Sequence, residues 1–224
     1  MKKIFISGIG TEVGKTYVTG QWLRLLVAKG VRASSFKLVQ TGMSPEATVA
    51  EDIVAHRQLS AQPLSSLDRA GLSCGAHFAY PASPHLAAAL EGKKIDGAVL
   101  SRRFEAFCQR AWAEVVLCEG AGGAWVPLHE SLLTVDWAKA QGLALVLVCN
   151  AMLGSLHHTL STLEALAGRG YLPHVVVYNA YPRTDAVIAQ DSARFLQAYM
   201  ARHYPSVVFC SFADGARLPQ WLLD

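Results

Sequence analysis

The sequence predicts an α/β fold, a doubly wound and mostly parallel sheet with helices on both faces. Strand-like and helix-like patterns alternate along all 224 residues, which is typical of that class. The run at 143–149 is so uniformly apolar that both of its faces should be covered by other elements. Polar residues also gather directly after several predicted strands, at the edge where an open parallel sheet binds its ligands.

In the first half of the chain, strands are predicted at 3–7 and 32–37. Between them, apolar residues recur at helical spacing up to Gly30, a residue that commonly ends a helix. Residues 60–82 show no clear period and are predicted to be irregular, while Pro84 suits the first turn of a helix. The helices predicted in this half cover 15–29, about 48–59, a stretch opened by Ser83-Pro84, and 95–112.

The second half of the chain repeats the alternation. Its predicted strands are 114–118, 143–149, 174–178 and 207–211, and its predicted helices are 155–167 and 184–202. No linker, internal repeat or low-complexity tract interrupts this order. The sequence therefore predicts a single domain that spans residues 1–224.

The composition argues against several function classes. The net charge is only +3 and the basic residues are scattered, which disfavours nucleic acid as a partner. The longest apolar run is strand-sized, too short to cross a membrane, and no signal-peptide pattern precedes the first strand, so a cytoplasmic protein is predicted. The five cysteines form no C-x-x-C and the eight histidines no H-E-x-x-H, which disfavours a disulfide framework and a structural metal site.

The segment GIGTEVGKT, residues 8–16, follows the first strand and opens the first helix. It ends in Gly-Lys-Thr as a P-loop does, but five residues separate Gly8 from Gly14 where the common pattern has four. Such a turn presents backbone N–H groups and the positive end of a helix dipole to an anion. Lys15 could reach the outer phosphates, and the Thr16 hydroxyl could bind Mg²⁺. The alternative is an ordinary strand-to-helix turn whose lysine and threonine are solvated.

Two carboxylates and a second lysine are predicted at the same edge of the sheet. Glu119 ends a strand and Asp52 lies early in the helix after the second strand, so both could complete a Mg²⁺ site. Lys37 ends the second strand, which is predicted to neighbour the first, and would point into the same crevice. There it could neutralise charge as a phosphoryl group moves. Alternatively, it is a strand-end lysine that extends to solvent.

Five motifs in a fixed order resemble one family, dethiobiotin synthetase, a branch of the P-loop NTPases. The long loop of that family, G-x-x-T-x-V-G-K-T, is similar to residues 8–16, so the extra residue is what the family shows. A strand-end asparagine matches Asn179, and the resemblance spans roughly residues 3–182. The other four motifs appear here as KLVQTG (37–42), PASPHLA (81–87), EGAGG (119–123) and LGSLHH (153–158).

The resemblance implies an ATP-dependent enzyme of biotin biosynthesis that closes a ureido ring. Such an enzyme joins CO₂ to 7,8-diaminononanoate, phosphorylates the resulting carbamate and closes the ring, giving dethiobiotin, ADP and phosphate. It is a cyclo-ligase that forms C–N bonds, takes ATP as co-substrate and Mg²⁺ as cofactor, and works in the cytoplasm as a homodimer. Its implied partners are small molecules and a second copy of itself, with no nucleic acid and no membrane.

The resemblance also implies roles for the motif residues. The implied catalytic residues are Lys37, Lys15 and Thr11. Nucleotide binding is implied for Glu12, Val13, Gly14, Lys15, Thr16, Tyr17, Asp52, Glu119, Gly120, Ala121, Gly122 and Asn179. Of these, Thr16, Asp52 and Glu119 would surround Mg²⁺, and Asn179 would read the adenine edge. Substrate binding is implied for Thr11, Lys37, Thr41, Ser83, Gly122, Leu153 and Gly154. The last two would bind the substrate carboxylate across the dimer interface, and for Ser83 a helix cap is the alternative.

The chain departs from the family pattern at three motif positions. Gly10 stands where the family usually has Asp, Leu38 replaces Pro, and His157 replaces Asn. The segment VVFCSFADGARLPQ lacks the family's Gly-x-[IL]-Pro turn, which helps to hold the base, so base selectivity is not predicted. The rival interpretations are a related amidoligase, a nucleotide-gated switch, and a nucleoside or nucleotide kinase. The switch proteins place a signature lysine where this chain has Gly10, which disfavours that class.

Overall fold

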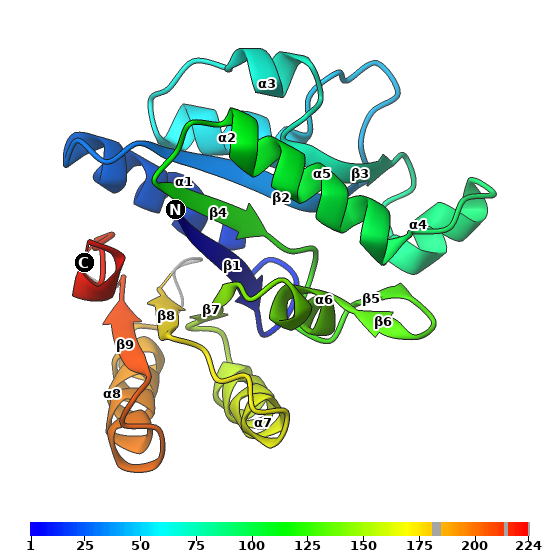
Figure 1. The fold of residues 1–224 in the computed structure, drawn as a ribbon. Helices are drawn as coiled ribbons and strands as arrows, with labels where there is room; N and C mark the ends of the chain where they lie inside the picture. The colour runs from blue at the N-terminus through cyan, green and yellow to red at the C-terminus, as the bar shows by residue number, and fades with distance from the viewer. Residues whose placement is uncertain (181–184, 213–214, 224) are drawn as a thin grey trace.

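The computed structural model describes residues 1–180, 185–212 and 215–223. Its main sheet has seven strands, and every neighbouring pair in it is parallel (Figure 1). In spatial order the strands are β3 (Cys74–Phe78), β2 (Ala33–Thr41), β4 (Val115–Glu119), β1 (Lys2–Gly8), β7 (Ala144–Asn150), β8 (Val175–Asn179) and β9 (Val208–Ser211). The fold class predicted from the sequence is confirmed.

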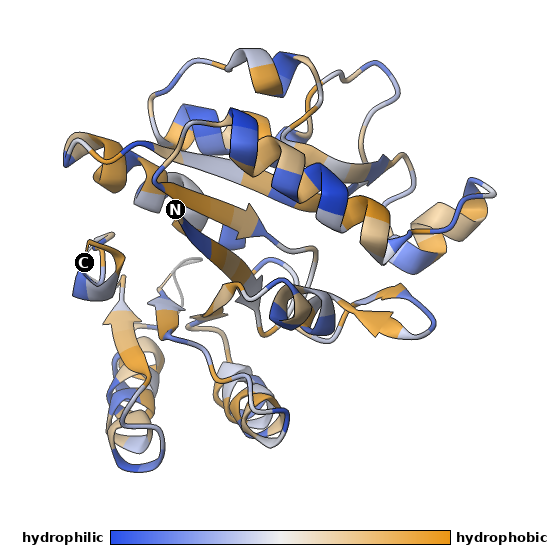
Figure 2. Cartoon of the chain, viewed as in Figure 1, coloured by the Kyte–Doolittle hydropathy of each residue, from blue (hydrophilic) through white to orange (hydrophobic). Residues whose placement is uncertain are grey.

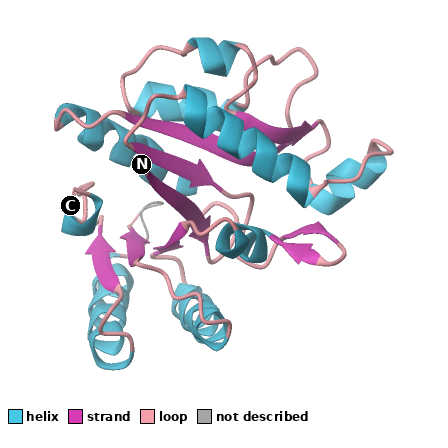
Figure 3. Ribbon diagram, viewed as in Figure 1, coloured by secondary structure: helices cyan, strands magenta, loops and turns pink. Residues whose placement is uncertain are grey.

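Helices pack on both faces of this sheet, as Figures 1 and 3 show. A small hairpin, β5 (Pro127–His129) with β6 (Leu132–Leu133), lies outside the sheet. The helices are α1 (Lys15–Ala28), α2 (Glu51–Leu59), α3 (Ser66–Arg69), α4 (Pro84–Leu90), α5 (Gly97–Arg110), α6 (Thr134–Ala140), α7 (Ser155–Gly168), α8 (Ala186–His203) and the 3₁₀ turn η1 (Gln220–Leu222).

Two apolar cores lie on the two faces of the sheet because side chains alternate along each strand. On β1, Phe5 packs in the core that holds α5, α6, α7 and α8, whereas Ile4 and Ile6 pack in the core that holds α1. The hydrophobic colour of the central strands in Figure 2 reflects this burial. β7 divides in the same way, with Leu145 and Val146 in different cores, so the expectation that both of its faces are covered is confirmed.

The prediction that residues 60–82 are irregular is wrong. They contain α3 and the edge strand β3, which pairs with β2. Ser65 begins α3 with a capping box in which it and Asp68 bond each other's backbone N–H groups. β3 is short, includes Gly75 and has one free edge, so its sequence carries little of the β-branched alternation that marks a strand.

The predicted order of the first strands is also wrong. β4 lies between β1 and β2, so the second strand in the sequence does not neighbour the first in the sheet. β2 continues to Thr41, which places Lys37 in the middle of the strand instead of at its end. Sequence proximity does not decide strand order, because any crossover helix can return the chain one or two strands away.

The boundaries of the other predicted elements differ from the structure by a few residues, whereas α6 and the β5–β6 hairpin lie where no element was predicted. The helix predicted from about 48 begins at Glu51. The helix predicted from 95 begins at Gly97, because the Asp96 carboxylate accepts the first free N–H groups as its cap. The predicted start at 184 lies outside the described residues, and α8 begins at Ala186. Within the part of the chain that the structure describes, no helix has the length and apolarity to cross a membrane.

Candidate functional site

The glycine loop, residues 9–14, joins the end of β1 to the start of α1. Gly14 is the N-cap of α1 with a φ of 95°, and a Cβ added there would meet the Asn179 amide nitrogen at 2.0 Å. Both the backbone conformation and the lack of space therefore require glycine at this position. No side chain caps α1, and its first turn holds no acidic residue. The free amides and the positive dipole end are thus arranged to receive an anion such as a phosphate.

Lys15, the first residue of α1, folds back over this loop. Its ammonium donates to the Gly10 carbonyl at 3.0 Å, and the side chain is buried. Burial and repulsion from Lys37 lower the pKa of Lys15 to about 8, although Glu119 and Asp52 oppose the shift. The lowered pKa means that the ammonium is incompletely compensated in this site. A phosphate anion held by the loop would supply the missing countercharge.

The register of β2 on β4 places Lys37 directly beside Glu119. The Lys37 ammonium donates to Glu119 Oε1 at 2.9 Å and to the Gly120 carbonyl at 3.1 Å, and it forms an ion pair with Asp52. Burial opposes both charges, but the attraction outweighs it, so the pKa of Lys37 is raised and that of Glu119 lies well below its usual range. Lys37 is only 4% exposed, so the alternative of a lysine extended to solvent is wrong.

The three residues predicted to surround Mg²⁺ come together at the same point. The Thr16 hydroxyl lies 3.0 Å from Glu119 Oε1 and 3.3 Å from Asp52 Oδ1. A hydroxyl and two carboxylates are oxygen donors of the kind that Mg²⁺ takes beside water and phosphate oxygens, so this set fits that ion. In residues 1–180, 185–212 and 215–223, no group of three or more His, Cys, Asp or Glu side chains could hold a metal by itself.

Behind Glu119 runs a buried chain of hydrogen bonds that the sequence analysis missed. His56 Nε2 lies 2.6 Å from Glu119 Oε2, and His56 Nδ1 lies 3.0 Å from Ser35 Oγ. Arg57 donates to Ser35 Oγ at 3.0 Å and makes two hydrogen bonds to the Asp68 carboxylate. All five residues are buried. The signal available in the sequence was spacing, since His56 follows the predicted acidic ligand on α2 by one helical turn.

The predicted loop at 119–123 packs directly against the glycine loop. The Ala124 N–H donates to the Gly8 carbonyl at 3.0 Å. A Cβ added at Gly123 would lie only 3.3 Å from the backbone of Gly10, so the two loops approach within backbone contact. Gly122 has a φ of 61°, a conformation that favours glycine. The EGAGG motif therefore forms one wall of the phosphate loop.

Other predicted nucleotide-binding residues lie around the same loop. Asn179, at the end of β8, donates its side-chain amide to the Val13 carbonyl at 3.0 Å and so braces the loop. Its contact with an adenine edge stays a prediction. Glu12 is exposed with a φ of 55°, and the exposed Tyr17 ring meets Phe212 edge-on at a centroid distance of 6.5 Å.

The predicted substrate residues follow strands on opposite sides of β1. Thr41 ends β2 and Ser83 precedes α4, and both are half-buried. Ser83 holds the N-cap position of α4, as the helix-cap alternative expected, but its side chain makes no capping hydrogen bond. Leu153 and Gly154 follow β7 on the other side and are exposed, as is Thr11 on the glycine loop itself.

The start of α7 carries a polar atom that the sequence analysis did not single out. Among the described residues, Ser155 Oγ is the buried side-chain polar atom without a hydrogen-bond partner. It is the first residue of α7, whose N-cap Gly154 has no side chain to satisfy the first amides. This helix start therefore offers a hydroxyl and amide donors to an anion.

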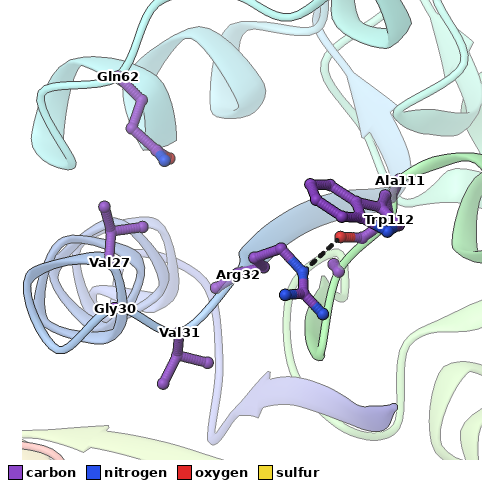
Figure 4. A pocket seen from close by; sticks show the side chains of 9 residues that line it. Val27, Gly30, Val31, Arg32, Gln62, Ala111 and Trp112 are labelled. Carbon is purple, nitrogen blue, oxygen red and sulfur yellow. Dashed lines mark hydrogen bonds between the residues drawn. The ribbon is translucent and has the colours of Figure 1, made fainter.

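A separate hollow of about 380 Å³ lies away from these residues, at the amino end of β2 (Figure 4). There the Arg32 guanidinium lies 4.6 Å from the centre of the Trp112 ring and donates to the Trp112 carbonyl at 3.3 Å. Its other walls are mostly apolar, including Val27 and Val31. Ligands of parallel sheets bind at the carboxyl ends of the strands, so this hollow is not the candidate site.

Comparisons with known proteins show the family to which this chain is similar. A family model described as an AAA domain matches residues 2–205. The ATP-dependent dethiobiotin synthetase BioD 2 of Pasteurella multocida (strain Pm70) is 37% identical over 208 residues, which cover 93% of this chain and 95% of that protein. The ATP-dependent dethiobiotin synthetase BioD of Chlorobaculum tepidum is 41% identical over 198 residues, covering 88% of this chain and 81% of that protein.

Two solved structures support the fold alone. Apo McdA from Cyanthece superposes with a TM-score of 0.51 and 14% identity, over 100% of this chain and 88% of that one. Chloroplast FtsY from Physcomitrella patens gives a TM-score of 0.51 and 17% identity, over 92% of this chain and 57% of that longer one. The family follows from the sequence relatives, which are 37% and 41% identical and align over most of both chains. The chain belongs to the ATP-dependent dethiobiotin synthetase family.

Proposed function

We propose that this protein is an ATP-dependent dethiobiotin synthetase, a cytoplasmic ligase of biotin biosynthesis. One observation in this family member carries the proposal. The buried Lys37 ammonium lies 2.9 Å from Glu119 Oε1, and the same oxygen accepts a hydrogen bond from the Thr16 hydroxyl beside the glycine loop. A phosphate loop, oxygen donors for a divalent cation and a second buried lysine are what phosphoryl transfer to a small acceptor needs.

The proposed reaction begins when one amine of 7,8-diaminononanoate attacks CO₂ and loses a proton, which gives a carbamate. A carbamate oxygen then attacks the γ-phosphorus of ATP, ADP leaves, and a carbamic-phosphoric anhydride forms. The second amine attacks the carbamoyl carbon, phosphate leaves with the bonding electron pair, and the nitrogen loses its proton as the ureido ring closes. Because both amines belong to one bound molecule, this last step is intramolecular and needs no second encounter.

The lysines, Thr16 and the two carboxylates each have a place in this scheme. Lys15 and the amides of the glycine loop would bind the terminal phosphates. Lys37 would neutralise the charge that develops on the moving phosphoryl group, since it is fixed by Glu119 and needs no rearrangement. Thr16, Asp52 and Glu119 would hold Mg²⁺, which when bound supplies charge neutralisation at the phosphate oxygens.

The two ends of the diamine would be held by different elements. Thr11, Thr41 and Ser83 would position the amines, with Gly122 allowing close approach of the backbone. The substrate carboxylate would bind at the start of α7, and the unpartnered Ser155 Oγ supports an anion there.

The same region supports a homodimer. Met152 and Leu153 are 50% and 89% exposed immediately before α7, and exposed apolar side chains of this size are typical of contact surfaces. We therefore place the contact with a second copy at this loop, next to the carboxylate end of the substrate.

A phosphate-release assay tests the function. Purified protein with ATP, Mg²⁺ and bicarbonate should release phosphate only after 7,8-diaminononanoate is added, and mass spectrometry should find dethiobiotin in equal amount. Running the assay with several nucleotides also determines base preference. Phosphate release that is independent of the diamine would contradict the proposal and favour a nucleotide-gated switch.

A further inference from the structure

The buried hydrogen bonds behind Glu119 connect this carboxylate through His56 to Ser35 and Arg57. Glu119 forms an ion pair with the buried Lys37 ammonium, 2.9 Å from its Oε1, so it is a carboxylate whose Oε2 can only accept a hydrogen bond. His56 Nε2, 2.6 Å away, must therefore carry the proton and donate it. Arg57 can only donate, so Ser35 Oγ accepts from Arg57 and its hydroxyl proton is free to go to His56 Nδ1 at 3.0 Å.

This assignment satisfies every group along the chain. Asp68 accepts two hydrogen bonds from Arg57 at 2.9 and 3.1 Å, which holds the guanidinium in plane with the carboxylate. Arg57 in turn fixes the Ser35 hydroxyl, and Ser35 fixes the tautomer and the ring orientation of His56. His56, Ser35 and Asp68 are completely buried, so no solvent competes with these bonds.

The two carboxylate oxygens of Glu119 have different hydrogen-bond partners. Oε2 is occupied by His56, whereas Oε1 meets the Thr16 hydroxyl at 3.0 Å and the Lys37 ammonium at 2.9 Å. Rotation of the carboxylate would break the bond to His56, so Oε1 is kept toward the phosphate loop. A carboxylate without this partner could turn to make both oxygens contact the lysine.

We infer that His56 is a positioning residue for Glu119: held by Ser35, Arg57 and Asp68, it fixes which carboxylate oxygen faces the bound nucleotide and its cation. The inference rests on the proposed nucleotide site, not on the identity of the second substrate. Partners that orient a metal-binding carboxylate typically change metal affinity about 10–100-fold when they are removed.

The test measures how strongly Mg²⁺ promotes nucleotide binding. The dissociation constant of a fluorescent ADP analogue is determined with EDTA and with saturating Mg²⁺, and the ratio of the two constants is the readout. His56→Leu keeps side-chain bulk and removes the donor, so we expect this ratio to fall about 10-fold or more while the constant in EDTA stays unchanged. His56→Gln restores an N–H donor of similar reach and should recover most of the ratio.

A matched control separates positioning from general damage to α2. Ser60, the C-cap of α2, is also buried, and its hydroxyl donates to the His56 carbonyl without touching Glu119. Ser60→Ala should lower thermal stability but leave the Mg²⁺ ratio at the wild-type value. Should His56→Leu fail to fold, Ser35→Ala provides the second test, because it removes the partner of Nδ1 and should lower the ratio in the same direction.

A wild-type ratio in folded His56→Leu, or in Ser35→Ala if His56→Leu is unfolded, would overturn the inference. An equal fall in Ser60→Ala would also overturn it, because the effect would then belong to α2 as a whole. The proposed function fails separately: a protein that binds the Mg²⁺-nucleotide through His56 and Glu119, yet releases no phosphate with the diamine, would keep this inference and lose the ligase activity.

Discussion

Replacement of Lys37 by methionine tests the centre of the proposed mechanism. The substitution keeps the apolar stem of a side chain that is 4% exposed and deletes only the ammonium. That ammonium contacts Glu119 Oε1 at 2.9 Å, the Gly120 carbonyl at 3.1 Å and the Asp52 carboxylate. Because Lys15 and the glycine loop are untouched, we expect nucleotide binding to persist while turnover is lost.

The expected magnitudes follow from this burial. Deleting one partner of a buried ion pair costs about 3–5 kcal/mol of folding stability in the absence of a cation. Loss of one preorganised charge in the active site costs about 10²–10³-fold in kcat. The depressed pKa of Glu119 contributes stability that is complete above its ordinary value of 4.5 and is lost as the pH falls toward the folded-state value. Without Lys37 this contribution shrinks, so acid unfolding should begin at a higher pH.

Three measurements check this prediction: phosphate release with the diamine, nucleotide affinity, and urea unfolding between pH 3 and 7. Lys3→Met is the matched control, since Lys3 pairs with Glu105 at 2.5 Å but the two side chains are 30% and 49% exposed. An exposed pair contributes at most about 1 kcal/mol, so the control should retain activity and nearly full stability. Unchanged turnover in Lys37→Met would remove this lysine from the mechanism.

Three further predictions concern the loop and the dimer. Gly14→Ala should abolish nucleotide binding and destabilise the fold more than Gly30→Ala. Both glycines have positive φ, but a Cβ at Gly14 would meet Asn179, whereas at Gly30 nothing lies within 4 Å. Equal shifts of the unfolding temperature in the two variants would refute this. Lys15→Met should weaken nucleotide binding yet raise the folding stability of the nucleotide-free protein by up to about 3 kcal/mol at pH 7, because the lowered pKa makes the buried ammonium destabilising while it is protonated. This gain in stability should disappear as the pH rises from about 8 toward 10.5. Lower stability of the variant at pH 7 would contradict the prediction. Leu153→Asp should leave the monomer folded and shift the protein toward monomers in light scattering; an unchanged dimer would place the interface elsewhere.

Several parts of the fold were predictable because their signals are local. The apolar run that becomes β7 identifies a strand covered on both faces, and Gly30 correctly marks the end of the first helix region. The spacing within residues 8–16 identifies an anion-binding turn, since a positive φ at Gly14 and a free helix start are properties of a few consecutive residues.

Other parts were not predictable from one sequence. β3 is an edge strand with weak alternation, and it exists because β2 is there to pair with it. The position of β4 between β1 and β2 depends on which helices pack on which face, and no local pattern encodes that choice. His56 carries no motif, and it gains its role only from Ser35 and Glu119, which lie 21 and 63 residues away in the sequence.

The sequence by itself determined the alternation of the main strands and helices, the glycine turn before α1 and the identities of Lys15, Thr16, Asp52 and Glu119, but not α3, β3, α6 or the β5–β6 hairpin. Those features depend on the spacing of apolar residues and on the backbone conformations open to single residues, and both are properties of short segments of the sequence. The tertiary structure alone decided that β2 pairs with β4 so that Lys37 faces Glu119, and that His56 holds the other carboxylate oxygen. Burial and strand register arise from contacts between distant segments, so the charged groups of this site interact strongly only when the sheet is assembled.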